Sequence, residues 1–161
     1  GKLAGPNTDE RHIKDPNAKH YKMRNRKRSS KEIRLATVNV KSLRTKEQEL
    51  ELENATKDLK YDILGISEMR KYGEAIIERA NGDMLSYIGE TKGQRGIGFI
   101  VKKHMKPYIH DIKGISAKIA VLILKVYGQR TTIIQVYAPK ESCSAKEIEE
   151  FYDLLDNTLN T

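Results

Sequence analysis

The fold is decided by two stretches, LATVN (residues 35–39) and DILGISE (residues 62–68). Both are short, mainly apolar runs that end in a polar residue, Asn39 or Glu68. Residues 33–40, which include the first stretch, are rich in β-branched residues, which predicts a β-strand. The second is apolar almost throughout, which favours a strand that is buried on both faces.

The sequence between these strands predicts an amphipathic helix over residues 46–60. Thr45 and Gln48 have the spacing of a capping box. Leu52, Ala55 and Leu59 then recur at helical intervals. A strand, a helix and a second strand in this order indicate a crossover between parallel neighbours.

Beyond residue 68 the pattern is one of short strands and turns, followed by a helix. Asn81-Gly82-Asp83 is a turn signal. Residues around Gly128-Gln129-Arg130 predict a β-hairpin, and Ser144 with Glu147 forms a second capping box before a helix with a clear apolar stripe. The predicted strands are residues 84–88, 96–101, 119–126 and 131–137.

The composition indicates a soluble intracellular protein. The 161 residues carry a net charge of +8 and contain a single cysteine, Cys143, so no internal disulfide and no cysteine metal cluster can form. The sequence has no run of eighteen apolar residues and no apolar signal segment. We therefore expect no membrane partner and a reducing compartment, the nucleus more than the cytoplasm.

The basic charge is concentrated in the first fifth of the chain. Residues 1–32 hold ten lysines and arginines against four acidic residues and have almost no aliphatic side chains. Such a segment buries too little surface to offset its ordering entropy, so we predict that it is disordered. It is interpreted either as a nuclear-localisation or phosphate-binding arm or as a solvated linker. The candidate nucleic-acid-binding residues in it are Arg24, Arg26, Lys27 and Arg28.

Asn39 and Glu68 are candidate ligand residues because each follows a predicted buried strand. If those strands are parallel neighbours, both side chains lie at the carboxyl edge of the sheet, where open sheets commonly bind ligands. A carboxylate and an amide oxygen suit Mg²⁺. The alternative is that Asn39 begins a turn and Glu68 is a solvated acid.

Five motifs in order resemble the endonuclease/exonuclease/phosphatase family. They are LATVNVKSLR (residues 35–44), DILGISEMR (62–70), GIGFI (96–100), IIQVYAP (133–139) and EIEEFY (147–152). Within the family, the chain is most similar to the apurinic-type endonuclease domain of non-LTR retrotransposons and to domains in craniofacial development protein 2-like proteins. The likeness covers about 120 residues, which is far more specific than any one motif.

The resemblance implies an α+β fold, the first half of a four-layer αββα sandwich of the DNase I-like type. It implies that Mg²⁺ or Mn²⁺ assists phosphodiester hydrolysis in DNA, with RNA as the alternative substrate. By motif, Asn39 and Glu68 would be metal-side residues, and Tyr137 would donate a hydrogen bond to the scissile phosphate. Tyr137 could instead pack against the sheet edge. Arg70 is a weaker candidate for phosphate contact.

The sequence also departs from the family pattern. Val38 stands where relatives usually have Trp, and Ala117 and Lys118 stand where relatives more often have Asp and Arg. The family's later Gly-Asp-x-Asn and Ser-Asp-His motifs are absent. We therefore expect residues 33–161 to be a truncated domain with an incomplete second sheet and an exposed apolar face. Pairing with the missing half, or self-association, would cover that face.

No other histidine is expected to replace the missing one. His12 and His20 fall in the basic segment, while His104 and His110 fall in a polar connection with no acid at helpful spacing beyond Asp111. The leading hypothesis is a metal-dependent endonuclease lineage whose chain lacks the Asp and His for efficient catalysis. The alternatives are a non-catalytic remnant that binds nucleic acid through its basic residues and, less favoured, a phosphatase or exonuclease.

Overall fold

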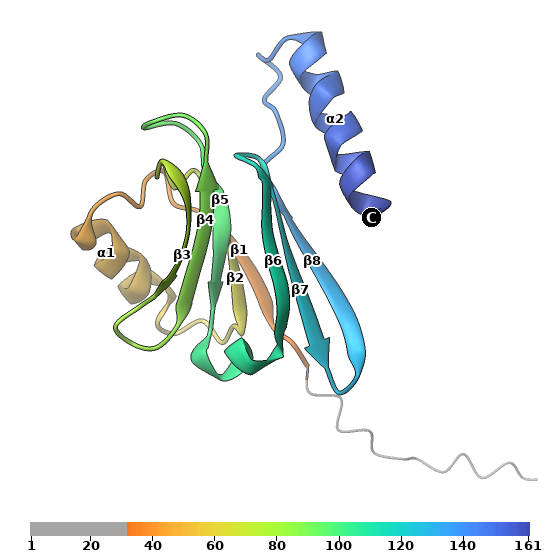
Figure 1. The fold of residues 1–161 in the computed structure, drawn as a ribbon. Coiled ribbons are helices and arrows are strands. Elements are labelled where there is room, and N and C mark those ends of the chain that lie inside the picture. The colour runs from red at the N-terminus through yellow and green to blue at the C-terminus, as the bar shows by residue number, and fades with distance from the viewer. Residues whose placement is uncertain (1–31) are drawn as a thin grey trace, which may run out of the picture. The chain divides into compact units, whose positions relative to one another are not determined.

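The computed structural model describes residues 32–161, and Figure 1 follows their secondary structure along the chain. The elements are β1 (Leu35–Asn39), α1 (Lys46–Thr56), β2 (Ile63–Ser67), β3 (Gly73–Glu78), β4 (Met84–Gly89), β5 (Ile97–Val101), the 3₁₀ helix η1 (Lys103–Tyr108), β6 (Ile109–Ser116), β7 (Ile119–Val126), β8 (Gln129–Val136) and α2 (Ala145–Leu159). Among these residues no helix has the length and apolar character needed to cross a bilayer.

The first sheet has the strand order β1-β2-β5-β4-β3. β1 and β2 are parallel, with Thr37 opposite Gly65 and Asn39 opposite Ser67. The other neighbours in this sheet are antiparallel. The parallel pair joined through α1 confirms the predicted crossover and brings the carboxyl ends of β1 and β2 to one edge.

The second sheet is antiparallel, with the order β6-β7-β8. The predicted hairpin is confirmed, but its turn is Tyr127-Gly128, one residue earlier than expected. Both turn residues have positive φ, 49° and 80°. This geometry matches the twist of a two-residue hairpin and lets Val126 pair with Gln129.

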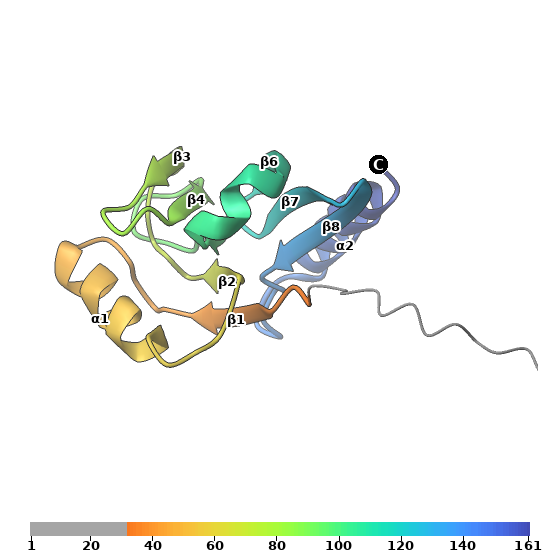
Figure 2. The same ribbon diagram turned by 90° about the horizontal axis from the view of Figure 1, so that it is seen from below.

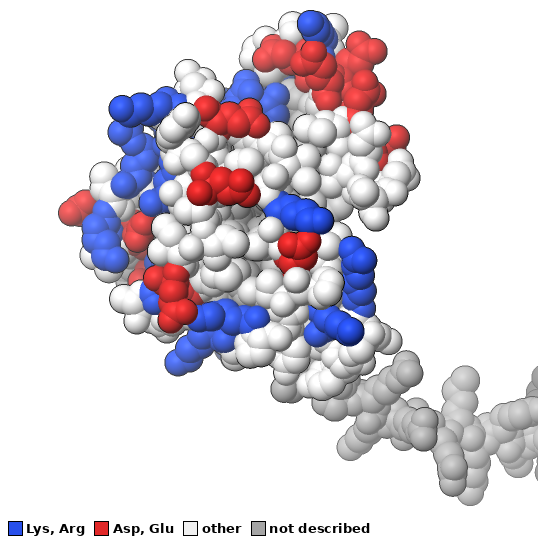
Figure 3. All heavy atoms as spheres, in the orientation of Figure 1, with Lys and Arg blue, Asp and Glu red and all other residues white. Residues whose placement is uncertain are grey.

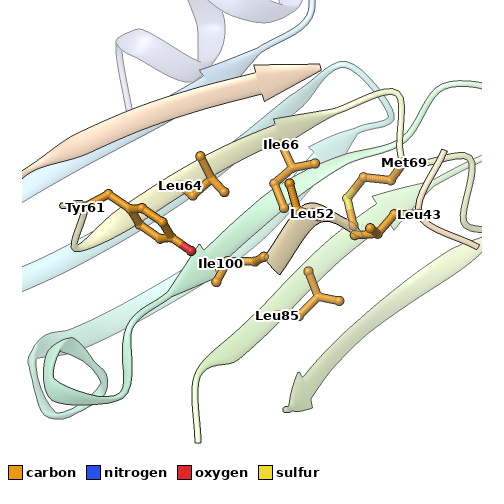
Figure 4. Close-up of a cluster of buried hydrophobic side chains, with 8 residues drawn as sticks. All are labelled: Leu43, Leu52, Tyr61, Leu64, Ile66, Met69, Leu85 and Ile100. Atoms are coloured by element: carbon orange, nitrogen blue, oxygen red, sulfur yellow. The ribbon is translucent and has the colours of Figure 1, made fainter. Parts of the chain in front are cut away.

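Two apolar clusters hold α1 and the two sheets together. One lies between α1 and the outer face of the first sheet, where Leu52 of the helix meets side chains of β2, β4 and β5 (Figure 4). The other lies between the sheets and includes Phe99 of β5 and Leu122 and Leu124 of β7. Figure 2 shows the two helices on opposite sides of the paired sheets. This order of layers agrees with the predicted α+β sandwich, and the second sheet has three strands among the described residues.

Among residues 32–161, the expected exposed apolar face of the first sheet is limited to the margins of that sheet. The three strands of the second sheet cover its centre, where Ile63, Ile97 and Phe99 are at most 1% exposed. Leu35 on the edge strand β1 and Ile76 on the edge strand β3 remain 57% and 59% exposed. The prediction was therefore too broad, since half of a sandwich still buries the middle of its larger sheet.

The first helix is shorter than predicted and ends at Thr56 rather than at residue 60. The Thr56 hydroxyl donates to the Leu52 carbonyl at 2.8 Å, and the Leu59 N–H bonds back to Thr56 at 3.0 Å. The chain turns here so that Tyr61 can be buried before β2 begins. As a result Leu59, expected on the apolar stripe, is 54% exposed.

Both predicted capping boxes are present. At α1, the Gln48 side chain accepts hydrogen bonds from the backbone N–H groups of Thr45 and Arg44, at 3.1 Å and 2.8 Å. The backbone N–H of Gln48 donates in turn to the Thr45 hydroxyl. Because α1 holds Leu52 in the core, its start is coupled to global stability.

Replacing Thr45 by alanine is expected to lower the free energy of unfolding by about 1 kcal/mol, the usual cost of losing an N-cap. The matched control is Thr45→Ser, which keeps the hydroxyl and should unfold close to the wild-type midpoint. Urea unfolding measures both variants. Equal losses in the two would show that the hydroxyl does not cap the helix.

Candidate functional site

The residues expected at the metal side of the site meet at one edge of the first sheet. Asn39 is the last residue of β1, and Glu68 follows the last residue of β2. Tyr137 follows β8 of the second sheet, and its hydroxyl donates a hydrogen bond to the Glu68 carboxylate. Residues from both sheets therefore join at this rim.

Backbone hydrogen bonds fix this rim. The Val40 N–H bonds to Ser67 at 3.1 Å, and the Tyr137 N–H bonds to the carbonyl of Lys118 at 2.8 Å. Glu68 and Arg70 have positive φ angles of 57° and 56°. Such angles are unfavourable for residues other than glycine and tend to cluster at functional sites.

The hydrogen bonds set the charge state of the central pair. The Tyr137 hydroxyl, followed by the Asn39 side chain, holds the pKa of Glu68 below its ordinary value, with Lys140 and Arg70 adding to the effect and partial burial opposing it. The same hydrogen bond to Glu68, together with burial, raises the pKa of Tyr137. At neutral pH the site therefore holds a carboxylate and a protonated phenol.

Basic side chains surround this pair. A cleft of about 480 Å³ is lined by Glu68, Tyr137 and the four basic residues Arg70, Arg95, Lys118 and Lys140. Figure 3 shows basic side chains around the ends of β4 and β5, while acidic ones gather over α2. The four positive charges outweigh the single negative charge of Glu68, so the cleft as a whole attracts anions.

The sequence predictions and the structure agree only in part on this cleft. Asn39, Glu68 and Tyr137 come together, and Arg70 lines the cleft. Arg95 and Lys140 were not expected there, and Lys118 was noted only as a departure from the family pattern. The four basic candidates Arg24, Arg26, Lys27 and Arg28 lie outside the described residues.

His104 has an acid partner, contrary to the sequence prediction. Its Nε2 atom lies 2.7 Å from Asp62 Oδ1. Burial raises the pKa of Asp62, but hydrogen bonds from the Arg34 N–H and His104 outweigh this, so the pKa is lowered overall. Asp62 directly precedes β2 and His104 lies in η1, so the pair is at the opposite end of β2 from Glu68. His110 lies in β6, and His12 and His20 fall outside the described part of the chain.

The donor atoms at this rim meet only part of what a divalent cation requires. Nowhere in residues 32–161 do three His, Cys, Asp or Glu side chains gather as a metal-binding group. The Asn39 Oδ1 atom accepts the Lys41 N–H at 3.1 Å, which is the turn contact that the alternative interpretation of Asn39 describes. Glu68 alone offers a carboxylate. This set fits a weakly held Mg²⁺ that keeps water and substrate phosphate as its other ligands, and it does not fit a closed site.

The fold is similar to that of two solved structures. One is the AP endonuclease LMAP from Leishmania major, with a TM-score of 0.55 and 13% identity over 79% of this chain and 46% of that chain. The other is the 3′ phosphatase NExo from Neisseria bound to a product DNA hairpin, with a TM-score of 0.52 and 16% identity over 78% of this chain and 51% of that one. The likeness shows the fold alone, and this chain spans about half the length of each structure.

No protein-family model and no curated protein matches the sequence. The α+β fold expected from the sequence motifs is nevertheless confirmed, since the chain matches about half of the DNase I-like fold that the two enzymes share. The finer resemblance to retrotransposon and craniofacial development protein 2-like domains stays a prediction.

Proposed function

We propose that the cleft beside Glu68 binds the phosphodiester backbone of nucleic acid as part of a metal-dependent endonuclease of the retrotransposon type. The observation that carries this proposal is the convergence of four basic side chains on one carboxylate–phenol pair. The solved structure with a bound DNA hairpin supports DNA as the ligand. RNA carries the same backbone charge and is the second candidate.

The chemistry of the central pair suits a phosphate ligand. The Tyr137 hydroxyl has one proton, which it donates to Glu68 in this structure. When a phosphate binds, the same proton can turn to a phosphate oxygen, and a donor aimed at an oxygen that gains negative charge stabilises the transition state of phosphoryl chemistry. Arg70 and Lys140 attract the same phosphate by charge. Glu68 remains ionised, and in the absence of phosphate Asn39 and Tyr137 restrain its orientation.

Glu68 is the residue that would hold a divalent cation. A bound Mg²⁺ or Mn²⁺ would neutralise phosphate charge and lower the pKa of a bound water. Without a cation, the same carboxylate repels a phosphate. Glu68 therefore has opposite effects on DNA affinity in the two conditions, and this contrast provides the test.

DNA affinity measured by fluorescence anisotropy is expected to rise when Mg²⁺ is added to wild-type protein. In Glu68→Gln this rise should disappear, while the affinity without metal should be unchanged or slightly higher because a negative charge is gone. The control is Glu141→Gln, an exposed acid in the loop before α2. A Mg²⁺ effect of the same size in Glu68→Gln would refute a cation at this carboxylate.

A second candidate function is nucleic-acid binding without catalysis. In the described part of the chain, Glu68 is the single acidic residue that lines the cleft. Hydrolysis needs further groups to activate water, so a cleft with one acid favours binding without turnover. Plasmid nicking in Mg²⁺ that stops with a chelator and with Glu68→Ala would establish the enzyme. Salt-sensitive DNA binding without turnover, lost when residues 1–32 are deleted, would favour the binding module.

A further inference from the structure

The parts of the candidate site belong to different sheets. Asn39 and Glu68 lie on the first sheet, and Tyr137 follows the last strand of the second. The distance between Tyr137 and Glu68 therefore depends on the relative position of the two sheets. The cluster between the sheets is mainly apolar. Apolar contacts are non-directional, so they fix a lateral position less closely than a hydrogen bond does.

A polar contact joins the sheets close to the site. The Gln135 Nε2 atom on β8 donates to Thr37 Oγ1 on β1 at 3.0 Å. Gly65 of β2 pairs with Thr37 in the first sheet. A Cβ atom at Gly65 would stand 2.1 Å from Gln135 Oε1, so the amide lies directly over this glycine.

The spacing along the strands links this contact to the site. Gln135 lies two residues before Tyr137, and Thr37 lies two residues before Asn39. Side chains two apart on a strand point to the same face and are separated by about 7 Å. Gln135 and Thr37 thus face the inter-sheet space one step inward from the rim.

We propose that Gln135 is a positioning residue for the Tyr137–Glu68 pair. Its hydrogen bond to Thr37, and its close approach to Gly65, hold β8 at the lateral position that brings the phenol to the carboxylate. This inference rests on the proposed function, because it concerns the same site. A side chain at residue 65 would displace the amide, so the glycine is part of the same arrangement.

The test compares variants that remove the hydrogen bond with one that keeps it. Thr37→Val and Gln135→Met are close to the original size and shape but lack the acceptor or the donor. Thr37→Ser keeps the acceptor and is the matched control. Thr37 is exposed on an edge strand, so its variants are expected to fold, and urea unfolding checks this.

The readout is the ¹³Cζ NMR resonance of Tyr137 in tyrosine-labelled protein, assigned with Tyr137→Phe. Hydrogen bonding of the hydroxyl shifts this resonance. In Thr37→Val and Gln135→Met it should move toward the resonance of Tyr127, whose side chain is 67% exposed, and in Thr37→Ser it should stay in place. An unchanged Tyr137 resonance in both variants, whatever their stability, would overturn the proposal.

Affinity for a single-stranded oligonucleotide separates this inference from the proposed function. With both correct, Thr37→Val should bind about three- to tenfold more weakly than Thr37→Ser, because the site loses its preorganisation. If the resonance moves but wild-type protein binds no oligonucleotide, the positioning role stands and the proposed function fails. Gly65→Ala should move the Tyr137 resonance in the same way as Gln135→Met. An unchanged Tyr137 resonance in Gly65→Ala would show that Gly65 is not needed to position the Gln135 amide.

Discussion

Replacing Phe99 by alanine is expected to remove about 3–5 kcal/mol from the free energy of unfolding. Phe99 lies on β5, in the middle of the five-stranded sheet, and is 1% exposed. Its side chain belongs to the cluster that joins the two sheets, together with Leu122 and Leu124. Truncation to alanine would remove apolar contacts with side chains of both sheets and leave a cavity between the sheets.

The size of this loss decides whether the variant folds. Domains of this size are stable by about 5–15 kcal/mol, so the change takes a large part of the total. Ile76→Ala is the control, since Ile76 is also apolar but lies 59% exposed on the edge strand β3. It should change stability by less than about 1 kcal/mol.

Urea unfolding followed by circular dichroism measures both variants. The midpoint of Phe99→Ala should fall with little change in slope, because the surface exposed on unfolding is nearly the same. A loss as small as that of Ile76→Ala would mean that the two sheets do not pack through Phe99. The order of layers described above would then need revision.

The sequence predicted elements whose apolar pattern is strong and local. β2 has five buried residues in a row, and this run, with the capping box at Thr45, was enough to predict the parallel pair and its crossover. β3 and β6 were not predicted. They are edge strands with alternating or mostly exposed residues, and their pairing depends on neighbours that are already in place.

The candidate site shows the same division. Asn39 and Glu68 could be predicted because parallel strands bring their carboxyl ends together. Tyr137 was found only through the resemblance, since nothing local shows that the second sheet lays it against Glu68. Arg95 and Lys140 come from loops, and their convergence on the cleft depends on the packing of two sheets. Asp62 and His104 are 42 residues apart in the sequence, so their spacing along the chain could not indicate that they form a pair.

Reversing two charges in the cleft is expected to weaken DNA binding by about 10- to 100-fold at low salt. The double variant Arg95→Glu/Lys140→Glu removes two of the four basic side chains that line the cleft with Glu68. Its structural cost should be small. Among the described residues, the Arg95 side chain makes a long surface contact with Glu147, at 3.9 Å, and such contacts contribute little to stability.

The salt dependence distinguishes phosphate contacts from other losses. For single-stranded DNA, each neutralised phosphate contributes about 0.7 to the slope of log affinity against log salt concentration. Loss of two contacts should therefore reduce the slope by about 1.4. The effect should be similar for oligonucleotides of different sequence, because contacts to phosphate carry no base information.

The matched control places the same charge change at the other end of the second sheet. Lys125 and Arg130 are paired across the β7–β8 hairpin, far from the strand end that leads to Tyr137, and both are exposed. Lys125→Glu/Arg130→Glu alters net charge by the same amount, and any contribution from residues 1–32 is common to both variants. If the binding site is the cleft, the control should lose far less affinity than Arg95→Glu/Lys140→Glu. Equal losses would mean that net charge alone governs binding and that the cleft beside Glu68 is not the nucleic-acid site.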